Sequence, residues 1–146
     1  MNTKFDIATA KFLEGYNCAQ AVVYSFSDDL QIDKNAALKM ACGFGAGMGR
    51  KEEVCGAVTG GIIAIGCKFG RGEEDDVAVT EFTYTKTQEL MDEFAKKHGT
   101  FSCRELLDGC DLATEEGRKH FNQSNLRNLT CLPCVQSVIE ILEKIM

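Results

Sequence analysis

Eight cysteines in a chain of 146 residues are the feature that most restricts what this sequence can fold into. In a secreted protein of this size they would form a disulfide framework, whereas cytosolic thiols stay reduced unless they carry out redox or metal chemistry. Residues 1–6 lack the basic start, apolar run and small-residue cleavage site of a secretory signal. We therefore expect a cytoplasmic protein whose cysteines have a chemical role.

The length and composition predict one compact domain spanning residues 1–146. The net charge of −6 argues against nucleic acid as a partner, because phosphate backbones are bound by clustered Lys and Arg. The longest apolar stretch, residues 54–69, contains four glycines and a lysine and is shorter than the ~20 apolar residues of a membrane span. We expect neither nucleic acid nor a membrane as a partner.

Hydrophobic periodicity predicts an all-α fold, a compact multi-helix single domain with a glycine-rich loop. Apolar residues recur at steps of three and four over residues 4–26, which predicts one long helix with Cys18 inside it. The β-branched residues between 76 and 85 leave a strand open as an alternative there. Further helices are predicted over residues 36–42, 54–68, 75–98, from 103 onward, 114–120 and 130–146, the last with Thr130 as its cap.

Glycines mark two further features of the chain. Glycine occupies every second position from Gly43 to Gly49, which predicts a loop with unusual backbone angles or a close backbone approach. This loop matches neither the dinucleotide-binding nor the Walker phosphate motif. Gly56 and Gly60, four residues apart on one predicted helix, would let a neighbouring helix pack closely, and they are compatible with a homodimer.

Three cysteines, Cys55, Cys103 and Cys131, fall in the first turn of a predicted helix. Free backbone N–H groups and the helix dipole favour a negative sulfur there, which suits a reactive thiolate or a metal ligand. A capping box formed by Ser102 and Glu105 surrounds Cys103, and we expect a pKa below about 8.5 for its thiol.

Spacing and neighbouring residues single out two further pairs of cysteines. Cys131 and Cys134 form a C-x-x-C, a spacing that suits a reversible disulfide or two ligands to one metal. Cys42 and Cys67 adjoin glycines at predicted helix ends, and we expect them to be packing residues.

Four features follow one another along the chain: Asn17-Cys18-Ala19-Gln20, the segment Val54-Cys55-Gly56-Ala57-Val58-Thr59-Gly60 after the glycine loop, Cys103, and a cysteine at the start of the last helix. In this order they resemble the C_GCAxxG_C_C family of redox-active proteins. The resemblance covers almost the whole chain, although the family label writes GCA where this chain has Cys55-Gly56-Ala57.

The resemblance implies a small cytoplasmic helical protein in which four cysteines act in redox chemistry. Carried over by position, these are Cys18, Cys55, Cys103 and Cys131, with Cys134 as the alternative to Cys131. Related domains resemble a module of multihaem electron-transfer proteins, which also implies that the same four cysteines can serve as ligands to an iron–sulfur cluster.

We therefore predict a redox protein whose converging cysteines transfer electrons to or from an unidentified partner protein. Electrons would pass through an iron–sulfur cluster or by dithiol/disulfide cycling. Two alternatives without redox activity stay open: a structural zinc site built from the same thiolates, and a helical module that binds a small ligand or a partner helix. The sequence names no reaction, so whether the protein is an enzyme is left open.

Overall fold

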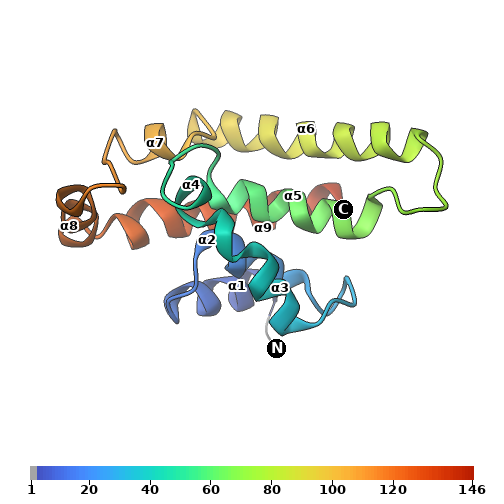
Figure 1. Ribbon diagram of the computed structural model, residues 1–146, viewed down its shortest axis with the longest axis horizontal. Coiled ribbons are helices and arrows are strands. Elements are labelled where there is room, and N and C mark those ends of the chain that lie inside the picture. Colours follow the sequence, from blue (N-terminus) through green and yellow to red (C-terminus); the bar gives the residue numbers. More distant parts are fainter. Residues whose placement is uncertain (1–2) are drawn as a thin grey trace.

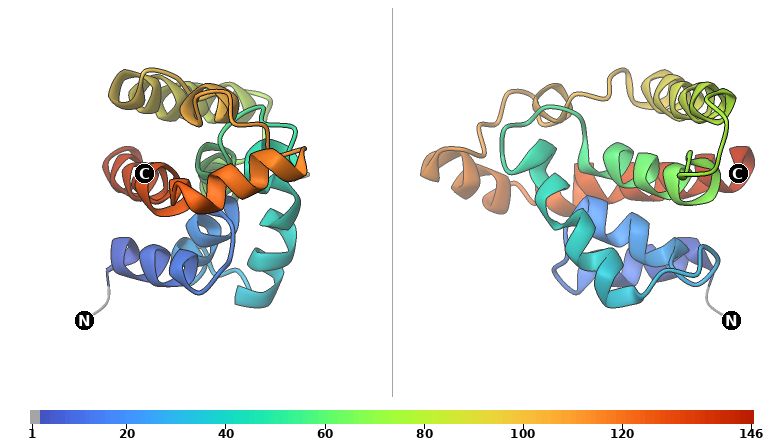
Figure 2. Two further views of the ribbon diagram at one scale, coloured as in Figure 1. Left: turned by 90° about the vertical axis from the view of Figure 1, so that its left-hand side faces the viewer. Right: turned by 45° about the vertical axis from the view of Figure 1, so that its right-hand side comes forward.

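The computed structural model describes residues 3–146 as an all-α fold, and no strand occurs among them. Figure 1 shows three layers, with α5 and α9 in the middle, α6 on one side, and α1, α2 and α3 on the other. Figure 2 shows the same layers from two further directions. The longer helices are α1 (Lys4–Leu13), α2 (Cys18–Phe26), α3 (Lys34–Ala41), α5 (Gly56–Phe69), α6 (Ala78–His98), α8 (Glu115–Gln123) and α9 (Leu132–Ile145), and the shorter ones are α4 (Gly45–Met48) and α7 (Cys103–Leu106).

The expected single helix over residues 4–26 is wrong, because the chain breaks between α1 and α2. Gly15 has a left-handed φ of +112°, and Asn17 then caps a new helix. The Asn17 side chain accepts a hydrogen bond from the Gln20 N–H (2.9 Å), and the Gln20 side chain accepts one from the Asn17 N–H (3.1 Å). Cys18 is therefore the first residue of α2 and does not lie inside a longer helix.

Glycines of α5 let α2 approach its backbone. A Cβ atom at Gly60 would lie 2.8 Å from the Ala19 carbonyl oxygen, and one at Gly56 would lie 3.3 Å from the Cys18 Cβ. The close helix packing expected from these glycines is thus made by α2 of the same chain. This face of α5 is buried inside the protein and is not free to contact a second copy.

The remaining helices follow the predictions, with one correction. The alternative strand over residues 76–85 is absent, because the chain is helical from Ala78. Thr130 does not cap the last helix, since a π-helical turn over Arg127–Cys131 runs directly into α9. Among residues 3–146, no helix combines the length and apolar character needed to cross a membrane.

Candidate functional site

The four cysteines singled out from the sequence all lie at helix starts. Cys18 and Cys103 are the first residues of α2 and α7, and Cys55 and Cys131 stand immediately before α5 and α9. Cys134 is the third residue of α9.

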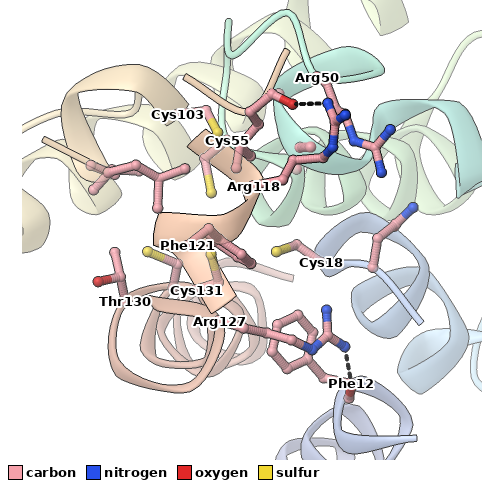
Figure 3. A pocket seen from close by; sticks show the side chains of 18 of the residues that line it. Phe12, Cys18, Arg50, Cys55, Cys103, Arg118, Phe121, Arg127, Thr130 and Cys131 are labelled. Atoms are coloured by element: carbon pink, nitrogen blue, oxygen red, sulfur yellow. Dashed lines mark hydrogen bonds between the residues drawn. The ribbon is translucent and has the colours of Figure 1, made fainter. Parts of the chain in front are cut away.

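One cavity of about 260 Å³ is lined by five of the thiols: Cys18, Cys55, Cys103, Cys131 and Cys134. Figure 3 shows side chains from separate helices facing this space. The structure therefore brings together the four predicted cysteines and also the alternative, Cys134. The volume lies just under the range of about 300–1,000 Å³ that is common for small-molecule sites.

Backbone pairing between two distant segments places Cys103 beside Cys55. Val54 and Ser102 form an isolated antiparallel bridge. The Cys55 N–H donates to the Phe101 carbonyl (2.8 Å), and the Cys103 N–H donates to the Glu53 carbonyl (2.7 Å). These contacts join segments about 50 residues apart, so the proximity of Cys55 and Cys103 is a tertiary feature.

The glycine-rich loop forms a left-handed turn against the cavity. Positive φ angles of 54° to 72° run without interruption from Ala46 through Arg50, which confirms the expected unusual backbone. Left-handed conformation costs about 1–2 kcal/mol for each residue with a Cβ, so the three non-glycine residues in this turn are strained. A Cβ at Gly47 would lie 2.8 Å from the Cys103 Cβ, so only glycine lets the turn pass this close to the thiol.

The five thiols include two neighbouring pairs. The Cys134 thiol shifts the pKa of Cys55, and the Cys131 thiol shifts the pKa of Cys18. All of these cysteines are free, with no disulfide among them. Each residue of the C-x-x-C therefore pairs with a cysteine from another helix, where the sequence suggested a pair within the motif.

The pKa of the Cys55 thiol is lowered, while those of two neighbouring thiols are raised. The adjacent Cys134 thiol lowers the pKa of Cys55 against the opposing effect of burial, and the backbone N–H groups of Ala57 and Val58 lower it further. The proximity of Cys55, together with burial, raises the pKa of Cys134. Cys18 also has a raised pKa, because its thiol lies beside Cys131 and is buried.

The expectation of a lowered pKa at Cys103 is wrong. Burial raises the pKa of its thiol to about 12, and the nearby Cys55, Cys131 and Glu52 raise it as well. The N–H groups that could stabilise a thiolate are already used: those of Cys103 and Arg104 donate to the carbonyls of Glu53 and Glu52. The helix α7 is also only four residues long, so its dipole is small.

The expected capping box at α7 is only half formed. The Ser102 hydroxyl accepts a hydrogen bond from the Glu105 N–H (3.3 Å), as predicted. The Ser102 N–H, however, donates to the Thr100 hydroxyl (3.1 Å), and the Glu105 side chain is not tied back to it.

Sequence reasoning missed three arginines that line the cavity, Arg50, Arg118 and Arg127. Arg127 donates hydrogen bonds to the carbonyls of Phe12 and Tyr16, and its guanidinium lies 3.8 Å from the centre of the Phe12 ring. Arg118 donates to the Leu112 carbonyl (3.0 Å). No shared spacing links the three positions, so the sequence carries no signal for this grouping.

Glu52 is a second residue that the sequence did not single out. Its side chain is 3% exposed, and Oε1 accepts a hydrogen bond from the Leu112 N–H (2.9 Å). Oε2 is buried without a hydrogen-bond partner among residues 3–146. Its charge contributes to the raised pKa of Cys103, so a carboxylate stands close to the thiols although it does not line the cavity.

Three cysteines lie outside the cavity. Cys42 and Cys67 are exposed, so the expectation that they are packing residues is wrong. Cys110 is buried and its thiol donates to the Gly117 carbonyl (3.1 Å).

Among residues 3–146, no three His, Cys, Asp or Glu side chains are arranged to hold one metal ion. A cluster differs from a single ion, because its cysteine ligands bind separate iron atoms. Five thiols around one cavity supply enough sulfur donors for such a cluster, and the three arginines would balance its negative charge. The donor set thus has the ligand type that iron–sulfur clusters use.

The family model described as "Putative redox-active protein (C_GCAxxG_C_C)" matches residues 16–145, and the chain belongs to this family. The matched residues include all five cysteines of the cavity. No curated protein and no solved structure matches the sequence at a significant level.

Proposed function

We propose that this member of the redox-active family is a thiol–disulfide redox protein that works through Cys55 and Cys134. One observation carries the proposal: Cys55, at the start of α5, and Cys134 line the same cavity, and the neighbouring Cys134 thiol lowers the pKa of Cys55. A thiolate is the nucleophile of thiol–disulfide exchange, and an adjacent thiol is needed to complete the exchange.

In the proposed reaction, the Cys55 thiolate attacks one sulfur of a substrate disulfide and forms a mixed disulfide. One substrate thiolate leaves and takes the proton of Cys134. The Cys134 thiolate then attacks the Cys55 sulfur and releases the second substrate thiolate. Two electrons pass to the substrate, which leaves as one thiol and one thiolate that takes a proton from solvent, and the protein gains a Cys55–Cys134 disulfide.

The second thiol pair can regenerate the first. Cys18 and Cys131 line the same cavity, and Cys131 lies close enough to raise the pKa of Cys18. In an exchange between the two pairs, Cys18 and Cys131 reduce the Cys55–Cys134 disulfide and become a disulfide themselves. The disulfide then lies at the half-buried pair and no longer at the more buried one. An unidentified cytoplasmic reductant, such as a partner dithiol protein, could then reduce the Cys18–Cys131 disulfide from outside.

An iron–sulfur cluster is the second candidate, and the observation that favours it is the gathering of five thiols and three arginines around one cavity. Cys18, Cys55, Cys103 and Cys131 would hold the cluster, with Cys134 as the alternative to Cys131. When bound, a cluster supplies one-electron transfer. Metal analysis of anaerobically purified protein separates the candidates: iron with acid-labile sulfide supports the cluster, stoichiometric zinc supports a structural site, and absence of both supports thiol chemistry.

A redox titration tests the thiol proposal. The protein is equilibrated anaerobically in dithiol/disulfide buffers of graded potential, and its free thiols are counted by alkylation and mass spectrometry. We expect two-electron transitions in the number of free thiols. Cys55→Ser should abolish the transition of the Cys55–Cys134 pair, while Cys67→Ser, outside the cavity, should leave all transitions unchanged. Identical titrations of the Cys55→Ser variant and the unsubstituted protein would refute the proposal.

A further inference from the structure

The lining of the thiol cavity has the opposite charge from the protein as a whole. The chain carries a net charge of −6, yet three of its five arginines line this cavity. Within residues 3–146, no Asp, Glu or Lys side chain contributes to the lining. The cavity is therefore a local concentration of positive charge in an acidic protein, and this distribution favours an anion inside it.

Among the described residues, no acidic side chain forms an ion pair with the three arginines, so their positive charges are not neutralised. Arg118 and Arg127 donate hydrogen bonds to backbone carbonyls, which fix the guanidinium groups without neutralising them. In the described part of the chain, every ion pair uses a lysine, and none uses Arg50, Arg118 or Arg127. Arginine also retains unused donors that can bind carboxylate or oxyanion oxygens.

The arginines are spread along the cavity. In the view of Figure 3, Arg50 and Arg118 lie above Cys18 and Arg127 lies below it. An anion in the cavity can therefore meet more than one guanidinium group. Glu52 opposes this attraction, but it lies outside the lining and one of its oxygens is bound to the Leu112 N–H.

The depth of the reactive pair limits the size of what can reach it. Cys55 is 6% exposed and Cys134 is 1% exposed, so the surface of a folded protein cannot bring a disulfide against them. The exposed residues Arg50 and Asn122 show that the cavity opens to solvent. A small molecule that fits about 260 Å³ can therefore enter where a protein cannot.

We propose that the substrate of this site is a small anionic disulfide, whose negative groups are bound by Arg50, Arg118 and Arg127 while Cys55 attacks its sulfur. This inference rests on the proposed thiol–disulfide function and adds the substrate class. The exchange is the one already described: the substrate S–S bond breaks, two anionic thiols leave, and Cys55 and Cys134 form a disulfide.

Three small disulfides that differ mainly in charge test the inference. Dithiodiglycolate is a dianion, 2-hydroxyethyl disulfide is neutral and cystamine is a dication at neutral pH. Formation of the Cys55–Cys134 disulfide is followed by quenched alkylation and mass spectrometry. Each rate is divided by the rate of the same reagent with the urea-unfolded chain, which removes differences in intrinsic reactivity.

We expect the corrected rates to fall in the order dianion, neutral, dication, and the preference for the dianion to weaken as salt is added. Replacing one arginine should reduce the dianion-to-neutral rate ratio about tenfold, the size expected for a hydrogen bond to a charged group. Arg50→Gln and Arg118→Gln test this. Arg71→Gln is the matched control, because Arg71 lies outside the cavity and donates to the Asp75 carbonyl.

Circular dichroism establishes that each variant is folded before its rates are compared. Arg118→Lys keeps the positive charge, so it should recover most of the preference for the dianion that Arg118→Gln loses. Equal corrected rates for the three reagents would overturn the substrate class and leave the thiol–disulfide function standing. An equal change in Arg50→Gln and Arg71→Gln would also overturn it. Failure of all three reagents to oxidise the pair in the folded protein would instead reject the proposed function itself.

Discussion

The contact between α2 and α5 at Gly60 sets how closely the Cys18 and Cys55 helices approach, and Gly60→Ala tests it. A Cβ there would lie 2.8 Å from the Ala19 carbonyl oxygen and 2.9 Å from the Ala19 Cα, and neither backbone atom can rotate away. Alanine gains about 1 kcal/mol of helix propensity over glycine. Overpacking costs about 1–3 kcal/mol, and a clash with backbone belongs at the upper end. We expect Gly60→Ala to lower the free energy of unfolding by about 2 kcal/mol.

Gly66→Ala in the same helix is the matched control. A Cβ at Gly66 meets no atom within 4 Å, so only the propensity gain of about 1 kcal/mol applies and the variant should be more stable. Urea denaturation followed by circular dichroism gives both free energies of unfolding. If Gly60→Ala stabilised the protein as much as Gly66→Ala does, the close approach of α2 and α5 would be refuted.

Three other predictions concern single side chains. Because the pKa of Cys103 is raised from 9.0 to about 12, the stability from its buried neutral thiol is complete below pH 9 and is lost as the pH rises towards 12. The urea midpoint should therefore fall less steeply over this range in Cys103→Ala than in the unsubstituted protein, and parallel curves would contradict this. Asn17→Ala removes the cap of α2 and should cost about 1 kcal/mol in urea denaturation, with no change if the cap does not form. Arg127→Gln loses the hydrogen bonds to Phe12 and Tyr16 and should lower the unfolding free energy by about 1–3 kcal/mol, which thermal or urea unfolding can check.

Local signals in the sequence were sufficient to predict a helix start where that start depends only on neighbouring residues. The Ser102 hydroxyl caps α7 and places Cys103 at its first position, as the sequence predicts. The break before α2 also had a local signal, since Gly15 is followed by the pair Asn17 and Gln20 that forms a capping box. The uninterrupted hydrophobic periodicity across residues 4–26 outweighed that signal and led to one helix where there are two.

The chemical character of the site depends on contacts that no local pattern contains. Cys103 was expected to be acidic from its helix start, but carbonyls from about 50 residues earlier occupy the N–H groups that a thiolate would need. The arginine grouping joins positions 50, 118 and 127, which share no motif. Such features arise from the packing of distant segments, so the sequence could predict which cysteines gather but not their pairing or their charged neighbours.

The central claim, that Cys55 and Cys134 form the working redox pair, is tested most directly by mapping the first disulfide that forms. Reduced protein is treated anaerobically with one equivalent of 2-hydroxyethyl disulfide, free thiols are blocked at low pH, and the linked peptides are identified by mass spectrometry. We predict that the Cys55–Cys134 link appears before any other. A first link between Cys131 and Cys134, or one involving the exposed Cys42 or Cys67, would contradict the claim.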